Sequence, residues 1–323
     1  MPREQRLRLL IAFAAVYLIW GSTYLAIRVA IETLPPFLMA AVRFLIAGSV
    51  LYAWARLRGA PHPTRAEWRA AAIVGVLLLA GGNGGVVWSE QIVPSGLTAL
   101  IVGAEPLWVV ILDWLRPGGA RPGLITGLGL IVGFLGVALL IAPGREGAGV
   151  VPILGAVVLT GAIISWAIGS IYSRTAPAPA SPLLGTGTKM LAGGVALGIM
   201  SVLAGEPAGF HVAAVSGRSL IALGYLIVFG AIVGFTAYIW LLRNTSLAKA
   251  STYAYVNPVV AVLLGWLILN EPLTARILLA TAIIVTAVIL ISGLPILRAG
   301  ARRLFGGATT LPPATVPSRP ADG

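Results

Sequence analysis

Long runs of apolar residues alternate with short polar segments along almost the whole chain. Ten of these runs approach the roughly 20 residues that a helix needs to cross the hydrocarbon core of a bilayer. They span residues 7–28, 37–54, 68–88, 95–115, 123–141, 150–172, 182–203, 220–242, 250–269 and 274–297. A membrane barrel would instead show alternating segments of about ten residues. The pattern therefore predicts an all-α membrane protein with ten transmembrane helices.

The second half of the chain repeats landmark residues of the first half at nearly constant spacing. The matched residues are Trp20, Arg28, Pro36, Arg43, Gly82 and Pro106 in the first half and Trp166, Arg174, Pro182, Lys189, Gly234 and Pro258 in the second. Each half holds five apolar runs, an odd number, so the two halves would cross the membrane in opposite senses. Such inverted repeats are typical of transporters. We therefore expect two five-helix repeats of inverted topology, over residues 1–145 and 146–298.

Charge orients this arrangement. The net charge is +12, and 58% of the residues are hydrophobic. With the N-terminus inside, most loop arginines and lysines fall on the cytoplasmic side, whereas only Arg145, Arg218 and Arg276 fall outside. This distribution follows the positive-inside rule, so the basic excess indicates orientation and not a nucleic-acid partner. We expect a protein of the bacterial inner (plasma) membrane with both termini in the cytoplasm. Residues 299–323 would form a disordered cytoplasmic tail.

Little in the sequence indicates catalysis. The chain has no cysteine, and its two histidines, His62 and His211, lie in loops between the apolar runs. A membrane-embedded enzyme would need a cluster of acid, base or nucleophile side chains, and the acidic residues are scattered. We therefore expect no enzyme activity, no metal site and no cofactor. A structural or sensory role would require an extramembrane domain, and the loops are short.

Several motifs carry a resemblance to a known family. They are Trp20-Gly21-Ser22-Thr23-Tyr24 in the first span, Pro36 and Arg43-Phe44 in the second, and Asn257-Pro258 leading to Asn270-Glu271-Pro272 before the tenth. With these marks the chain resembles the EamA-type members of the drug/metabolite transporter superfamily, and among them the YddG-like amino acid exporters. Asn270 stands where the family pattern usually has glycine, and the first half has no glutamate at the matching position. The resemblance implies an uncoupled or weakly coupled exporter of neutral and aromatic amino acids.

Depth along the spans selects the first candidate binding residues. Glu105 lies ten residues into a span, about 15 Å deep at 1.5 Å per residue, and its repeat partner Asn257 reaches a similar depth from the other side. Each precedes a proline, which removes a backbone donor and frees carbonyl groups that a substrate can use. We predict that Glu105 and Asn257 organise a midplane site. The alternative is a structural kink in which Glu105 pairs with Arg43 or Lys189.

Arg43 and Lys189 each lie seven residues past a helix-opening proline. Inversion would place Arg43 nearer the outside and Lys189 nearer the inside. They are candidate gating residues, which would attract a carboxylate or pair with neighbouring helices when each gate shuts. The alternative is that both long side chains extend to the nearest membrane interface.

Aromatic and amide residues complete the predicted site. Trp20, Trp108 and Trp166 lie deep in their spans, and Tyr253 and Tyr255 flank Asn257. An aromatic surface beside a carboxylate suits an amino acid or another small amphipathic cation. Asn83 stands within Gly81–Gly85, where we expect the helix to be interrupted; close helix packing through the glycines is the alternative.

These residues favour a monomeric exporter that alternates access to a midplane cavity. We expect its partners to be membrane lipid and a small-molecule substrate, namely neutral or aromatic amino acids. The alternatives are other small amphipathic compounds and nucleotide-linked or phosphorylated sugars. Dianionic sugars would favour several basic groups at the centre, whereas the deepest charge is Glu105.

Overall fold

Every regular element of the described chain is a helix. The computed structural model describes residues 3–117, 119, 121–142, 151–244 and 253–305, without the side chains beyond 291 and a few others, Tyr255 among them. The helices are α1 (Arg3–Ala30), α2 (Pro36–Leu57), α3 (Arg65–Gly75), η1 (Val76–Asn83), α4 (Gly84–Ser89), α5 (Ser95–Val102), α6 (Glu105–Leu115), α7 (Leu124–Ile141), α8 (Ile153–Ser173), α9 (Pro182–Leu203), η2 (Glu206–Gly209), η3 (Val212–Ala214), α10 (Gly217–Tyr225), η4 (Leu226–Val233), α11 (Gly234–Asn244), α13 (Tyr253–Leu269) and α14 (Ala275–Phe305). Helix α14 continues past residue 298, where the predicted tail begins, and residues 306–323 of that tail lie outside the described chain.

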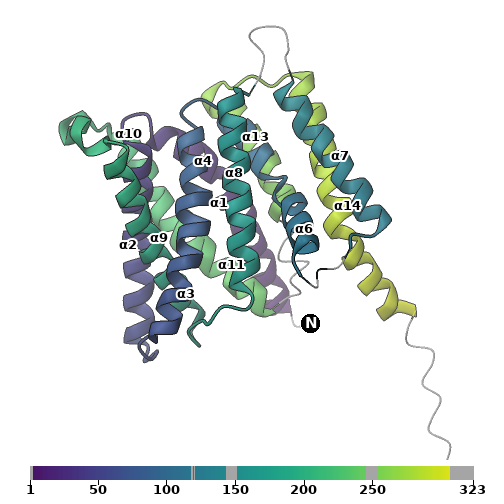
Figure 1. The fold of residues 1–323 in the computed structure, drawn as a ribbon, viewed down its shortest axis with the longest axis horizontal. Coiled ribbons are helices and arrows are strands. Elements are labelled where there is room, and N and C mark those ends of the chain that lie inside the picture. Colours follow the sequence, from purple (N-terminus) through teal and green to yellow (C-terminus); the bar gives the residue numbers. More distant parts are fainter. Residues whose placement is uncertain (1–2, 118, 120, 143–150, 245–252, 306–323) are drawn as a thin grey trace, which may run out of the picture.

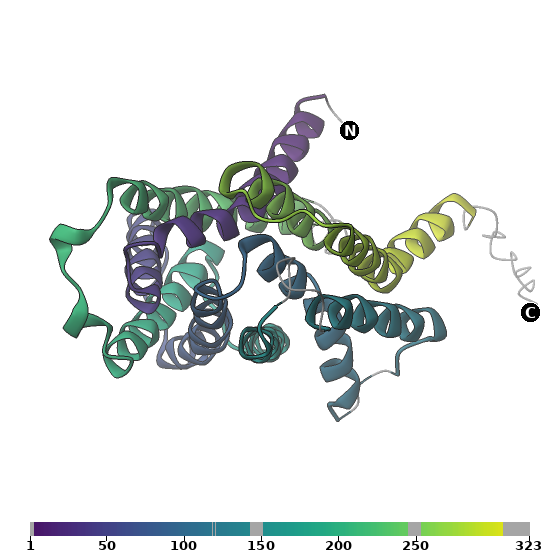
Figure 2. The same ribbon diagram turned by 90° about the horizontal axis from the view of Figure 1, so that it is seen from above.

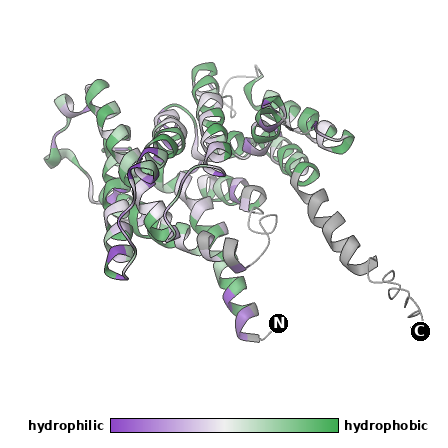
Figure 3. Cartoon of the chain, turned by 60° about the horizontal axis from the view of Figure 1, so that its bottom comes forward, coloured by the Kyte–Doolittle hydropathy of each residue, from purple (hydrophilic) through white to green (hydrophobic). Residues whose placement is uncertain are grey.

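The apolar runs form helices that suit a bilayer. Eight helical segments are long and apolar enough to cross a membrane, and two shorter apolar helices, Val256–Leu269 and Ala275–Ile291, follow them. Many large apolar side chains on these helices are exposed, such as Leu18, Leu135 and Val157. Apolar residues cover the helices along much of their length (Figure 3). This chain is therefore a multi-pass, all-helical membrane protein.

The helices form two rows. Helix α1 packs against α10, η4, α11 and α13, which we call the first row; α8 packs against α3, η1, α4, α5 and α6, the second row. At one end of the bundle α2 pairs with α9, and at the other α7 pairs with α14 (Figures 1 and 2). We call the face on which α1 begins, at the bottom of Figure 1, the near face, and the opposite face the far face.

Glycines allow the paired helices to pack closely. A Cβ on Gly48 of α2 would lie 2.9 Å from the Leu191 backbone nitrogen of α9, and one on Gly187 would lie 2.8 Å from the Tyr52 nitrogen. On α7, a Cβ on Gly136 would lie 2.8 Å from Ile284 of α14. These glycines thus serve helix packing inside the chain, as close helix contacts in membranes generally require small residues.

Three spans depart from regular α-helix. The chain turns at Gly103 and Ala104, so the span divides into α5 and α6 just before Glu105. The interruption expected at Gly81–Gly85 is absent: η1 is π-helical and leads directly into α4. A second π-helical segment, η4, occupies the matching span of the second half. Helix α13 also runs on through Pro258.

Candidate functional site

A cavity lies between the two rows and is bounded at the back by α2. Its volume is about 140 Å³, counted as the space open to the centres of water-sized molecules. Six of the predicted binding residues line it, together with Arg43: Trp20, Asn83, Glu105, Trp166, Tyr253 and Asn257. They come from five spans separated in sequence, so the fold gathers them into one site.

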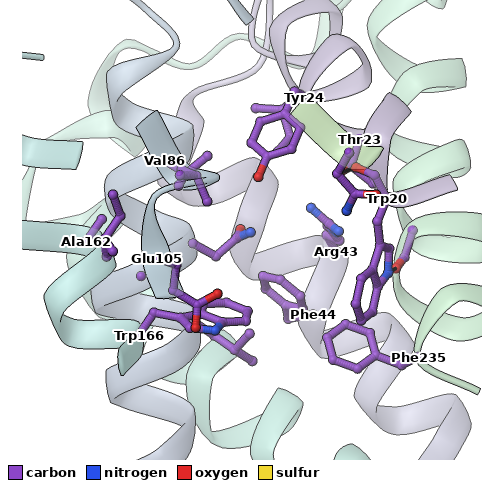
Figure 4. Close-up of a pocket in the computed structure, with 18 of the residues that line it drawn as sticks. Trp20, Thr23, Tyr24, Arg43, Phe44, Val86, Glu105, Ala162, Trp166 and Phe235 are labelled. Atoms are coloured by element: carbon purple, nitrogen blue, oxygen red, sulfur yellow. Dashed lines mark hydrogen bonds between the residues drawn. The ribbon is translucent and has the colours of Figure 1, made fainter. Parts of the chain in front are cut away.

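Two opposite charges face each other across this cavity. Figure 4 shows Arg43 projecting from α2 toward the interior and Glu105 projecting from the opposite side, at the start of α6. Arg43 is 4% exposed, and neither its Nε nor its Nη1 has a hydrogen-bond partner among the described residues. Its guanidinium lies 4.8 Å from the centre of the Phe44 ring. Among the described residues no ion pair joins Glu105 to Arg43 or Lys189. Both charges are therefore available to a ligand.

Aromatic rings form the wall on the side of the first row. The Trp20 ring lies 5.3 Å from Phe235, 5.1 Å from Tyr238 and 5.0 Å from Tyr253, measured between ring centroids. Its indole N–H donates to the Gly230 carbonyl at 3.2 Å, which fixes the ring orientation. Trp166 of α8 forms part of the opposite wall (Figure 4). Such rings offer an apolar surface to a substrate and their faces to a cation.

The two candidate amides differ in what they offer. The Asn83 side-chain oxygen is buried without a hydrogen-bond partner in the described chain, so it is open to a ligand. Asn257 is already engaged: in the orientation that satisfies its amide, the nitrogen donates to the carbonyls of Tyr253 and Tyr17, each at 3.2 Å. Asn257 therefore braces α13 against α1 where the two helices pass the cavity.

The glycines around Asn83 serve helix packing. A Cβ on Gly82 would lie 2.8 Å from the Trp166 ring, and one on Gly85 would lie 2.7 Å from the Ala162 Cβ. This segment therefore brings η1 and α4 against α8. Asn83 turns away from that contact into the cavity.

Two predicted residues whose side chains the structure describes, Trp108 and Lys189, are not among the cavity lining. Trp108 packs edge-on against Phe134 of α7, with ring centroids 5.4 Å apart. Three residues advance a helix by about 300°, so Trp108 lies about 60° around α6 from Glu105, far enough to meet another helix. Lys189 is half-buried on α9, with its backbone against Gly75 of α3. Tyr255 belongs to α13, and its side chain lies outside the described residues.

Several residues that line the cavity were not predicted from the sequence. Thr23, Tyr24, Phe44 and Phe235 face the cavity (Figure 4). Tyr24 follows Trp20 by four residues, so helical spacing alone places both on one face of α1. Phe235 carried no comparable signal, because its position opposite Trp20 depends on how α11 packs against α1.

A buried carboxyl group lies close to this site. Glu90 follows the span that ends at Ser89; it is fully buried, and neither carboxyl oxygen has a hydrogen-bond partner in the described chain. Burial raises the pKa of Glu90 well above its usual value, and the neighbouring Glu271 raises it further, while Arg28 and Arg43 act in the opposite direction. Arg28 donates to the backbone carbonyl of Glu90.

Comparisons with known proteins agree with this architecture. One solved structure aligns with this chain with a TM-score of 0.62 and 22% sequence identity. The alignment covers 92% of this chain and 98% of the other, so the two proteins share a fold. The uncharacterized inner membrane transporter YedA of Escherichia coli K12 is 42% identical over 293 residues, which cover 90% of this chain and 93% of the relative. The uncharacterized transporter YvbV of Bacillus subtilis is 25% identical, covering 90% and 92%.

A family model matches the chain twice, over residues 7–142 and 153–293. The two matches together cover most of the sequence, and their division falls near the centre, where the sequence pattern begins to repeat. The chain therefore belongs to the EamA-like transporter family and is a membrane transporter.

Proposed function

We propose that this transporter exports neutral or aromatic amino acids in zwitterionic form. The observation that carries the proposal is the placement of two oppositely charged side chains, Arg43 and Glu105, on the two sides of an aromatic cavity, with the Nε and Nη1 of Arg43 lacking a hydrogen-bond partner among the described residues. Arg43 would bind the carboxylate and Glu105 the ammonium group, while Trp20 and Trp166 contact the side chain. Charge-assisted hydrogen bonds are roughly twice as strong as neutral ones, so this pairing favours a ligand carrying both charges.

We further propose that the protein has ten spans in two five-helix repeats of inverted topology, with both termini in the cytoplasm. The repeat of landmark residues and the distribution of loop arginines support this topology. The occurrence of π-helical segments in matching spans, η1 and η4, also supports it. In this orientation the far face is the external one, and transport would proceed by alternating access around the cavity.

Phosphorylated or nucleotide-linked sugars suit the cavity less well. A phosphate dianion would need several cationic groups, and Arg43 is the one Lys or Arg side chain among the described residues that line the cavity, where it faces the carboxylate of Glu105. Small amphipathic amines would satisfy Glu105 but would leave the buried Nε and Nη1 of Arg43 without a hydrogen-bond partner among the described residues and the ligand. Burial of an unpaired charge is costly, so the zwitterion is the better match.

The experiment is a counterflow assay in proteoliposomes loaded with a neutral aromatic amino acid. We expect uptake of the labelled amino acid, competition by other neutral amino acids, and weak competition by sugar phosphates. Repeating the assay with and without a pH gradient tests the expectation of weak coupling. Exchange of sugar phosphates without exchange of amino acids would refute the proposal.

A further inference from the structure

The two rows meet closely at the far face. There α5 of the second row packs against α13 of the first. A Cβ on Gly96 would lie 3.0 Å from the Val262 Cα, and one on Gly103 would lie 2.7 Å from the Pro258 ring. Toward the near face, α6 continues the same span as α5 but packs against α8 and α14. The described residues thus close the cavity on the far side.

A single carboxylate bridges the rows at this closure. Glu271, in the connection between α13 and α14, accepts hydrogen bonds from the backbone N–H of Ser95 at 2.7 Å, the Ser95 hydroxyl at 2.8 Å and the backbone N–H of Gly96 at 3.0 Å. Ser95 and Gly96 are the first residues of α5. An anion at a helix N-terminus satisfies free N–H groups and interacts favourably with the helix dipole.

The conformation of the chain at the end of α13 places the Glu271 carboxylate at the start of α5. A Cβ on Gly265 would overlap the Glu271 side chain, so glycine leaves room for it. Asn270 adopts a left-handed conformation with φ of 53°, which asparagine tolerates better than most residues, and this turns the chain back toward α5. The Glu271 N–H then donates to the Gly265 carbonyl at 3.1 Å.

We propose that Glu271 is a latch residue, which holds the far side of the cavity closed and must release α5 when the transporter opens on that side. The inference rests on the alternating-access part of the proposed function and not on its substrate. Opening would separate Glu271 from Ser95 and Gly96 and expose the cavity to the far side. Glu271 is then a positioning residue for the transport cycle and does not contact substrate.

Glu206 provides a matched control. Its carboxylate caps a second helix in the same way, accepting from the backbone N–H of Phe37 at 3.0 Å and of Leu38 at 2.8 Å. These two residues lie in the first turn of α2, and Glu206 begins η2, shortly after α9 ends at Leu203. Helices α2 and α9 pair closely with each other. The Glu206 contact therefore does not join the two rows, and its loss should not open the cavity.

The test uses accessibility of a cysteine in the cavity, for which the chain is suited because it contains no native cysteine. Val102→Cys places a thiol in the lining at the end of α5. A membrane-impermeant maleimide is added to either side of sealed vesicles, and the labelling rates are compared for the parent, Glu271→Ala and Glu206→Ala. Loss of several charge-assisted hydrogen bonds should raise far-side labelling about tenfold in Glu271→Ala. In Glu206→Ala it should remain within about twofold of the parent.

Equal far-side labelling in the parent and Glu271→Ala would overturn the latch, as would a similar rise in both variants, which indicates general loosening. Gly265→Ala displaces the carboxylate without removing it and should reproduce the effect if Glu271→Ala does not fold. The readout needs no substrate. A changed labelling pattern in a protein that fails to exchange amino acids would therefore support the latch while refuting the proposed substrate.

Discussion

At the scale of single residues, the residues that line the cavity differ in how well their positions can be predicted from the sequence. Depth along the spans and helical spacing suffice to select Trp20, Glu105 and Trp166, because both follow from position in a helix. The role of Arg43 does not follow in this way. Its expected place at a gate came from its distance to Pro36, whereas its position in the cavity depends on how α2 packs behind the two rows.

Asn257 and Trp108 show the same limit. The sequence places Asn257 at the correct depth, but its amide is occupied by backbone carbonyls of Tyr253 and Tyr17. Trp108 is one turn from Glu105, but the packing of α6 turns it toward Phe134. Depth is therefore predictable from sequence, whereas the partner that a side chain meets depends on tertiary packing.

Glu90 should make stability depend on pH. A carboxyl whose pKa is raised by folding holds its proton more tightly in the folded state, so its contribution is full below the unfolded pKa and is lost as the pH rises through the folded value. Glu90→Gln mimics the protonated form. We expect this variant to melt at a higher temperature than the parent at pH 8, and the difference to shrink as the pH falls toward 4.5, the ordinary pKa of a glutamate.

Thermal unfolding in detergent micelles at several pH values measures this effect. The exposed Glu4→Gln, which removes a surface charge paired with Arg8, serves as the control and should show no such trend. A Glu90→Gln variant that melts below the parent at pH 8 would contradict the interpretation. That result would mean that Arg28 and Arg43 hold Glu90 ionised in the folded protein.

At the scale of elements, the positions of the helices follow well from the apolar runs, but their irregularities do not. The sequence pattern predicts an interruption at Gly81–Gly85, but it gives no such prediction for Gly103. The first is stabilised as a continuous helix because its glycines pack against α8, and only the second divides a span. A weak helix former thus marks a place where the helix can change, and the neighbouring helix determines whether it does.

The α2–α9 pair gives a prediction at this scale. Gly48→Ala places a Cβ within 3.0 Å of backbone atoms of α9, which cannot move aside as a flexible side chain would. We expect a loss of about 1–3 kcal/mol in stability, seen as a lower melting temperature in detergent. Gly127→Ala on α7 is the control, because no described residue other than its neighbours in the helix comes within 4 Å of its added Cβ. Equal melting temperatures for both variants would show that this contact is not tight.

At the scale of the whole molecule, the arrangement of charges predicts the orientation. Cysteines introduced at Ala208, on the far face after α9, and at Arg65, at the start of α3, should lie on opposite sides of the membrane. Impermeant reagent added to intact cells should label the cysteine at 208 and spare the one at 65, because basic loops remain in the cytoplasm. The reverse pattern would invert the topology, and labelling of both would contradict a membrane-spanning bundle between them.

The central claim is that one cavity recognises both charges of a zwitterion, and substrate discrimination by Arg43→Gln and Glu105→Gln tests it most directly. Phenylalanine, phenethylamine and 3-phenylpropionate share one aromatic side chain and differ in their charges. Their competition against amino acid exchange is measured in proteoliposomes for each variant. We expect the parent to prefer the zwitterion over either singly charged ligand by about tenfold or more. Glu105→Gln should lose the preference over the acid, and Arg43→Gln the preference over the amine. Equal losses for all three ligands in both variants, or an unchanged preference in folded protein, would contradict the account.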